Sequence, residues 1–160
     1  MMTLPEPTGQ SAQSSAPIVL LGGLPGSGKT SYARTLAEHG WRLFDDFQKR
    51  AYNDSAAFRD SRHFPELLEA IRKGTRCIVA DIRVVHAEYR ADAQRTLRRE
   101  LGDVAIEVCL FANDPAQCAQ NIRNAPERRM EKRLEGIVFW SKHYSCPPGA
   151  RVIPVWRPSQ

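Results

Sequence analysis

The sequence predicts an α/β domain in three layers, in which about five parallel strands form a sheet with helices on both faces. Short apolar runs recur along the chain, and most of them lack the clean alternation of a sheet that has one face in water. Segments with well-marked helix ends separate these runs. Strands that alternate with helices are joined by right-handed crossovers, so we expect the strands to be parallel.

The chain is expected to form one domain. Its 160 residues are 42% hydrophobic and 26% charged, which suits a single ordinary core. Residues 1–16 are rich in Pro, Ser and Gln and are predicted to be a disordered tail, which leaves residues 17–160 as the domain. No apolar stretch approaches the ~20 residues that cross a bilayer, and the N-terminus does not resemble a signal peptide. We therefore expect a cytoplasmic protein that has no membrane partner.

Strands are predicted at the apolar runs, each of which is short enough to be a strand. These runs are Ile18 to Leu21, Trp41 to Phe44, Cys77 to Ala80, Val104 to Phe111 and Val152 to Trp156. The four cysteines are widely spaced and lack metal-ligand spacing, so we expect reduced thiols.

Helices are predicted between the strands, with boundaries marked by proline and glycine. They are Lys29 to His39, Pro65 to Lys73, His86 to Leu101, Pro115 to Asn124 and a segment that begins at Pro126 and runs towards Tyr144. The first three are each followed by a glycine that can end a helix, at Gly40, Gly74 and Gly102. Asn113 or Asp114 can cap the fourth.

The stretch "GLPGSGKT", from Gly23 to Thr30, lies between the first strand and the first helix. A glycine, four residues and then Gly-Lys-Thr in this context form a phosphate-binding loop (P-loop, or Walker A motif). Its glycines are Gly23, Gly26 and Gly28, and they let the backbone wrap closely around an anion. An ordinary glycine turn is the alternative, but the four fixed positions rarely coincide by chance.

Each part of this loop has an expected role towards a nucleoside triphosphate. The amides from Gly26 to Thr30, with Ser27 among them, should face the β-phosphate together with the helix N-terminus. Lys29 should bridge the β- and γ-phosphates, and the Thr30 hydroxyl should bind Mg²⁺. The sequence therefore predicts binding of ATP or a related triphosphate with Mg²⁺.

Three features together resemble the small P-loop kinases, and within them the polynucleotide-kinase-like and zeta-toxin-like group. They are "GLPGSGKT", the "FDDF" that closes the second strand, and an Arg-rich segment after the fourth strand. The resemblance covers Pro17 to about Trp156. It implies a P-loop NTPase fold with an Arg-bearing lid, and an enzyme that transfers the γ-phosphoryl of ATP to an acceptor.

The resemblance implies that an aspartate at the end of the second strand accepts the proton of the acceptor hydroxyl. By position this residue is Asp45, with Asp46 either assisting or capping the turn; both could also be plain turn residues. Polynucleotide kinases carry an arginine three residues beyond this base, where the present chain has Gln48. A small-molecule acceptor is therefore favoured over a nucleic-acid 5′-hydroxyl.

The third strand, "RCIVAD", ends at Asp81. This residue matches the Walker B carboxylate that holds Mg²⁺, usually through water. Ile82 follows, where motor-type ATPases generally carry a glutamate that activates water, so transfer to an acceptor is favoured over dedicated hydrolysis. Arg83 either clamps a phosphate on the substrate or pairs with a carboxylate.

The Arg-rich segment supplies the candidate lid. Arg129 and Arg133 are four residues apart and should share one helix face, from which either could neutralise the transferred phosphoryl group. Gly136 is expected to interrupt this helix, as a hinge or a simple break. An apolar stripe should pack on the domain; it comprises Met130, Leu134, Ile137 and Val138. An amphipathic helix with a solvated basic side is the alternative.

Two rival functions belong to other classes. The net charge of +5 favours anionic partners in general. A nucleotide-gated regulatory protein would hydrolyse ATP without an acceptor, and Ile82 argues mildly against this. A nucleic-acid-binding module would use the basic helix from Arg90 to Arg99, although such a helix is more often a solvated face.

Overall fold

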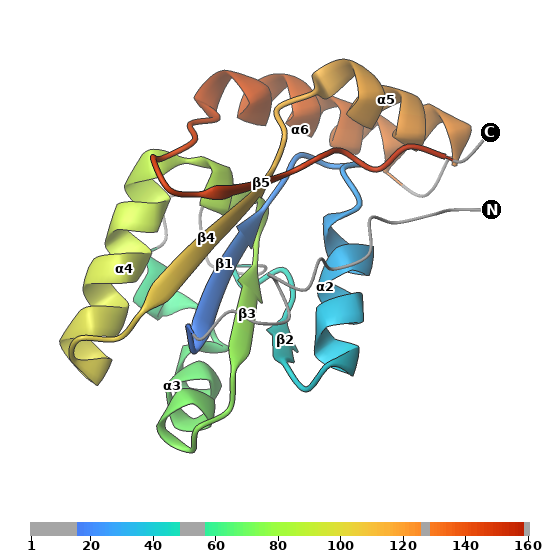
Figure 1. Ribbon diagram of the computed structural model, residues 1–160. Coiled ribbons are helices and arrows are strands. Elements are labelled where there is room, and N and C mark those ends of the chain that lie inside the picture. The colour runs from blue at the N-terminus through green and yellow to red at the C-terminus, as the bar shows by residue number, and fades with distance from the viewer. Residues whose placement is uncertain (1–15, 49–56, 126–128, 159–160) are drawn as a thin grey trace.

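A computed structural model describes residues 16–48, 57–125 and 129–158, and residues 1–15 of the predicted tail lie outside this range. Five strands form one parallel sheet in the order β2-β3-β1-β4-β5 (Figure 1). The strands are β1 (Ile18–Gly22), β2 (Arg42–Phe44), β3 (Cys77–Ala80), β4 (Ile106–Phe111) and β5 (Arg151–Ile153). The predicted five-stranded parallel sheet is confirmed.

The helices also follow the predicted order. They are α2 (Lys29–Glu38), α3 (Phe64–Arg72), α4 (Ala87–Leu101), α5 (Pro115–Asn124) and α6 (Met130–His143), with two 3-10 helices, η1 (Phe58–Asp60) and η2 (Ile82–Val85). Gly40, Gly74 and Gly102 follow α2, α3 and α4 with positive φ angles, as their proposed role in ending these helices requires. Strand β5 is shorter than predicted because Pro154, which lacks an N–H, follows it.

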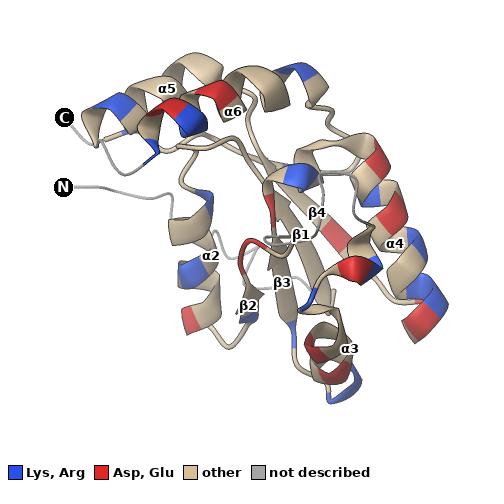
Figure 2. Cartoon of the chain, turned by 180° about the vertical axis from the view of Figure 1, so that it is seen from behind, with Lys and Arg blue, Asp and Glu red and all other residues tan. Residues whose placement is uncertain are grey.

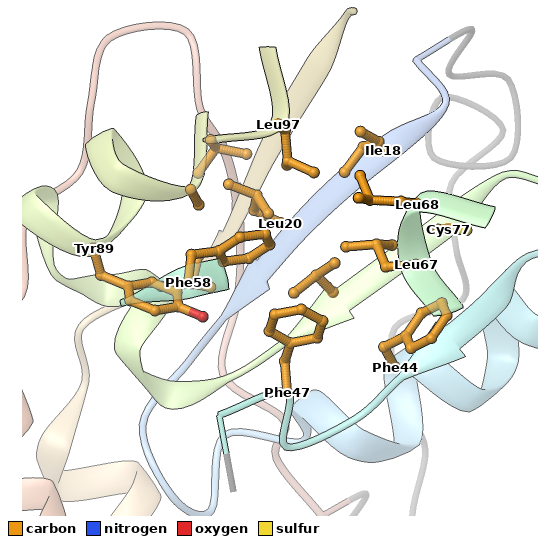
Figure 3. Packing of buried hydrophobic residues seen from close by; sticks show 14 of the residues in the cluster. Ile18, Leu20, Phe44, Phe47, Phe58, Leu67, Leu68, Cys77, Tyr89 and Leu97 are labelled. Atoms are coloured by element: carbon orange, nitrogen blue, oxygen red, sulfur yellow. The ribbon is translucent and has the colours of Figure 1, made fainter. Parts of the chain in front are cut away.

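Both faces of the sheet are buried, which explains why the strands lack alternation. Along β1, Ile18 and Leu20 pack into one hydrophobic cluster, whereas Val19 and Leu21 pack into another. Helix α2 covers the second cluster, and helices α3 and α4 cover the first. Figure 3 shows this first cluster, with Leu67 and Leu68 of α3 and Leu97 of α4 packed over β1. The three-layer prediction is therefore confirmed.

Helices α5 and α6 pack against each other at the carboxyl edge of the sheet, beyond the ends of β1 and β4 (Figure 1). Together with the phosphate loop and the segment after β5 they form a third hydrophobic cluster, which contains Leu24, Cys118, Ile122, Ile137 and Val155. In the described part of the chain, no helix is long and apolar enough to cross a membrane.

Two expectations for α6 are wrong. Gly136 does not interrupt the helix; it lies inside α6, where a Cβ would come within 3.5 Å of Pro25 Cγ in the phosphate loop. This is an ordinary van der Waals distance, so a side chain as small as alanine would also fit at this position. Val138 does not join the packed stripe: it is 57% exposed and is absent from the cluster that contains Met130, Leu134 and Ile137.

Two substitutions one residue apart test how α6 docks. Ile137 is 3% exposed, so Ile137→Ala should lower the free energy of unfolding by about 2 to 5 kcal/mol. Val138→Ala is the matched control and should change it by less than about 0.5 kcal/mol. Urea unfolding of the two variants gives both values. Equal losses would contradict the described docking of the helix.

Candidate active site

Three predicted site elements lie side by side at the carboxyl edge of the sheet. Asp45 follows β2, Asp81 follows β3 and the phosphate loop follows β1, and these strands are neighbours in that order. Adjacent strands are separated by about 4.8 Å, so the ends of β2 and β1 are about 10 Å apart. Ligands of open parallel sheets bind at this edge. The topology thus brings residues from three distant parts of the sequence into one region.

The phosphate loop has the backbone geometry of an anion cradle. Gly26 and Gly28 adopt φ angles of 83° and 98°. Helix α2 starts directly after Gly28 with no side-chain cap on its first amides and no acidic residue in its first turn. A Cβ on Gly23 would come within 2.6 Å of Ser27 Oγ, so only glycine fits there without a shift. The free amides and the positive helix end suit a phosphate group.

Two side chains of this loop lack partners among the described residues. Ser27 is 1% exposed, and its hydroxyl has no hydrogen-bond partner in the part of the chain that the structure describes. Lys29 is partly buried, and its ammonium makes no hydrogen bond or ion pair with any described residue. Buried polar groups are nearly always satisfied, so these residues fit a site that is completed by an anionic ligand such as a triphosphate.

Asp81 is buried and accepts three hydrogen bonds. Its Oδ2 accepts one from the backbone N–H of Gln48 at 2.8 Å. Its Oδ1 accepts one from the backbone N–H of Arg83 at 2.9 Å and one from the Arg83 guanidinium at 3.3 Å. Arg83 therefore forms the ion pair that was one of the two expectations for it.

The fit of Asp81 to Mg²⁺ depends on what these bonds leave open. A carboxylate has about four acceptor positions, so one position remains on Oδ2. No group of three or more His, Cys, Asp or Glu side chains is arranged around a metal site within the described residues. Mg²⁺ commonly takes only one or two protein carboxylates and fills its shell with phosphate oxygens and water. Asp81 with the Thr30 hydroxyl is compatible with that kind of site.

Gln48 is a buried hydrogen-bonding residue whose role sequence reasoning missed. Its side-chain amide donates to the carbonyl of Ala57 at 3.3 Å and accepts a hydrogen bond from the Tyr89 hydroxyl at 3.0 Å. Burial raises the pKa of Tyr89, and the charge of Asp81 raises it further, so this hydroxyl stays protonated and remains a donor. The side chain of Gln48 is thus engaged inside the protein, next to the Asp81 carboxylate that its backbone binds.

Asp45 and Asp46 have different environments. Asp45 is partly buried, and its Oδ1 accepts a hydrogen bond from the backbone N–H of Asp46 at 3.0 Å. Asp46 is exposed and has a φ of 48°. Asp45 therefore closes the turn after β2 with one oxygen, while its Oδ2 has no partner among the described residues.

The two candidate lid arginines do not share a helix face. Helix α6 begins at Met130, whereas the sequence predicted a start at Pro126; residues 126–128 lie outside the described residues. Arg129 precedes the helix with a left-handed φ of 68°, which a helical residue does not adopt, and its side chain is exposed. Arg133 lies in the first turn of α6 and is partly buried.

Asn121 of α5 is a second residue that sequence reasoning missed. Its amide donates to the carbonyls of Gly26 and Trp156, at 2.9 and 2.7 Å, and it is 6% exposed. The sequence feature that could have indicated its burial is its position on the apolar face of α5, three residues after Cys118 and next to Ile122. A polar residue on an apolar face needs a buried partner, but the helix alone does not identify that partner.

Solved structures provide the comparison with known proteins. A gluconokinase from Sinorhizobium meliloti 1021 superposes with a TM-score of 0.56 and 16% sequence identity, over 88% of this chain and 83% of that one. The chain therefore shares the α/β fold of this kinase, a five-stranded parallel sheet covered by helices. A protein described as APE1195 has a TM-score of 0.55 and 19% identity, over 87% of this chain and 84% of that one. Neither any protein-family model nor any curated protein gives a match.

The tight fit of Gly26 gives a test of the loop geometry. A Cβ at this position would lie 2.4 Å from the backbone oxygen of Cys118, whereas one on Gly40 would meet nothing within 4 Å. Gly40→Ala carries only the cost of an L residue at positive φ, about 1 to 2 kcal/mol. Gly26→Ala carries that cost and should lose about 1 to 3 kcal/mol more by displacing α5. Chemical unfolding of both variants measures this difference, and equal losses would contradict the contact.

Proposed function

We propose that this protein is a P-loop kinase that transfers the γ-phosphoryl group of ATP, with Mg²⁺, to an acceptor hydroxyl or phosphate. The observation that carries the proposal is the phosphate loop itself. Its helix start is uncapped, its lysine is unpaired among the described residues, and a buried hydroxyl lacks a partner. This loop shares its edge of the sheet with two aspartates. Triphosphate binding supplies the partners that the loop lacks.

The loop and the metal-binding residues hold the nucleotide. The amides from Gly26 to Thr30 bind the β-phosphate, except that of Ser27, which the sequence predicts in this set but which donates to the carbonyl of Leu24 at 3.1 Å. Lys29 bridges the β- and γ-phosphates. Thr30 and Asp81 would hold Mg²⁺, Asp81 through its remaining acceptor position or through water. The ion would supply positive charge that offsets the charge on the phosphate oxygens.

Asp45 acts as the general base. The acceptor oxygen attacks the γ-phosphorus while the bond from this phosphorus to the bridging oxygen breaks, and ADP leaves. The proton of an acceptor hydroxyl passes to the Oδ2 of Asp45, which has no partner in the described part of the chain. Asp46 lies next to this base with its side chain in solvent, where it is available to contact the acceptor.

Charge that develops on the transferred group is stabilised by an arginine of the lid, Arg129 or Arg133. Arg129 is exposed directly before α6, and α6 packs on Pro25 of the phosphate loop. Arg83 contributes less to acceptor binding under this proposal, because its guanidinium already pairs with Asp81.

We assign the chain to the polynucleotide-kinase-like and zeta-toxin-like group because of the aspartate pair that follows β2. Within this group we favour a small-molecule acceptor. Gln48 is engaged by Ala57 and Tyr89, so it is not free to bind a nucleic-acid phosphate. Helix α4 carries acidic and basic residues along its length (Figure 2). One of its arginines, Arg90, is buried and binds the carbonyl of Val84 and the hydroxyl of Ser145. A continuous basic stripe for nucleic acid is therefore not favoured.

Triphosphate binding is tested with Lys29→Ala. Removing the charge should weaken ATP binding about thirtyfold or more, because the phosphates lose a partly desolvated ammonium. Lys73→Ala is the control, since Lys73 is exposed between α3 and the start of β3, at the opposite edge of the sheet from the loop, and pairs with Glu69. Calorimetric titration with ATP and Mg²⁺ measures both variants. Unchanged affinity in Lys29→Ala would refute the nucleotide site.

Phosphoryl transfer is tested by comparing the unmodified protein with Asp45→Asn, using ATP that is labelled on its γ-phosphate. The acceptor pools are 5′-hydroxyl oligonucleotides, nucleosides with their monophosphates, and a small-metabolite extract. Label should enter one pool, and Asp45→Asn should reduce the transfer rate about 100-fold or more while ATP affinity is kept. Asp46→Asn should retain most of the activity, because its side chain points to solvent.

Two outcomes would contradict this assignment. Full phosphoryl transfer by Asp45→Asn would mean that a residue other than Asp45 is the general base. Release of inorganic phosphate at the same rate with every pool would favour the alternative function, a nucleotide-gated regulatory protein that hydrolyses ATP without an acceptor.

A further inference from the structure

We propose that Asn121 is a positioning residue of the phosphate loop: it fixes the direction of a loop amide by joining the loop to the segment Val155–Arg157 that follows β5. The inference rests on the proposed function, because it concerns how the same loop is held ready for a triphosphate. Asn121 acts through the loop backbone and is not proposed to contact the nucleotide.

The observation is a ring of buried hydrogen bonds that joins three parts of the chain. Both N–H groups of the Asn121 amide are used, one for the carbonyl of Gly26 and one for the carbonyl of Trp156. The backbone N–H of Trp156 in turn donates to the carbonyl of Ser27 at 3.0 Å. The side-chain oxygen of Asn121 accepts a hydrogen bond from Gln117 at 2.9 Å, which fixes the orientation of its amide.

Because of the geometry of the peptide unit, this ring of hydrogen bonds sets the direction in which an N–H group of the loop points. In a planar trans peptide, the carbonyl of one residue and the N–H of the next point in opposite directions. When Asn121 holds the carbonyl of Gly26, it therefore fixes the Gly26–Ser27 peptide unit, whose N–H donates to the carbonyl of Leu24 at 3.1 Å and closes the turn of the loop. When Trp156 holds the carbonyl of Ser27, it fixes the N–H of Gly28 in the same way. The Gly28 amide belongs to the set expected to bind the β-phosphate, and Asn121 supports it by holding both the preceding peptide unit and Trp156.

The carbonyls of Gly26 and Trp156, which accept from Asn121, have no donor that could easily replace it. The backbone at Gly26 is packed so tightly on α5 that a Cβ would lie 2.4 Å from the oxygen of Cys118. Two buried donors lie nearby without partners in the described part of the chain, Ser27 Oγ and Trp156 Nε1, and neither bonds to these carbonyls. Loss of the Asn121 donors would add two unsatisfied carbonyls, and the loop would rotate to regain partners.

The experiment measures phosphate affinity in the full chain with two probes, ATP and inorganic tripolyphosphate, each with Mg²⁺. Asn121→Leu should weaken the binding of both probes by the same factor, about tenfold or more, because the effect passes through amides that meet only phosphate. Gln117→Ala should weaken both about twofold to fivefold, because it releases the orientation of the Asn121 amide without removing its donors.

Two controls separate positioning from a general loss of stability. Asn124→Leu changes the same residue type on the exposed end of α5 and should leave both affinities unchanged. Ile122→Val lowers stability at the neighbouring buried position without touching a donor, and should also leave both affinities unchanged. Melting temperatures measured without ligand give the stability loss of each variant.

Each further outcome has a definite meaning. The proposal would be overturned if both Asn121→Leu and Gln117→Ala bound the two probes with wild-type affinity. It would also be overturned if Ile122→Val lost as much affinity as an Asn121 or Gln117 variant that has the same melting temperature. A loss for ATP but not for tripolyphosphate would also overturn it, because Asn121 would then act at the nucleoside. If the unmodified protein binds neither probe, the proposed kinase function fails and this inference fails with it, a result that differs from all the others. Should Asn121→Leu not fold, Gln117→Ala decides.

Discussion

The constraint on which the rest of the structure depends is the orientation of the peptide units in the phosphate loop. A loop that turns its amides towards an anion turns its carbonyls into the protein, and each buried carbonyl then needs a donor. Asn121 of α5 and the backbone of Trp156 supply these donors. Helix α5, helix α6 and the segment after β5 are therefore parts of one unit with the loop, which shares a hydrophobic cluster around Leu24 and Ile137.

The parallel sheet provides the second level of organisation. Since β1 lies at the centre of the sheet, the phosphate loop emerges between the ends of β3 and β4. The turn after β2 crosses the end of β3, where the backbone N–H groups of Phe47 and Gln48 bind Ala80 and Asp81. The proposed metal carboxylate is thereby held by the same turn that carries the proposed base, Asp45. Tyr89 reaches this turn from α4 through Gln48.

Much of the fold could be predicted from the sequence because its signals are local. Apolar runs, helix-ending glycines and the "GLPGSGKT" loop each act within a few residues, and the five strands and five α-helices occur where these signals stand. Predictions failed where packing decides. Arg129 adopts a left-handed conformation directly before α6, and Gly136, whose residue type predicts a helix break, lies inside an unbroken helix.

The sequence by itself determined the alternation of strands and helices and the glycine and lysine spacing on which the proposed phosphate binding rests, because both follow from residue type and spacing. Only the tertiary structure decided which polar residues support that loop. Gln48, Tyr89 and Asn121 belong to no motif, and each is satisfied by a partner at least nine residues away, in most cases more than thirty. A hydrogen bond between residues so far apart in the sequence depends on the order of the strands and the packing of the helices, so no local sequence pattern predicts it.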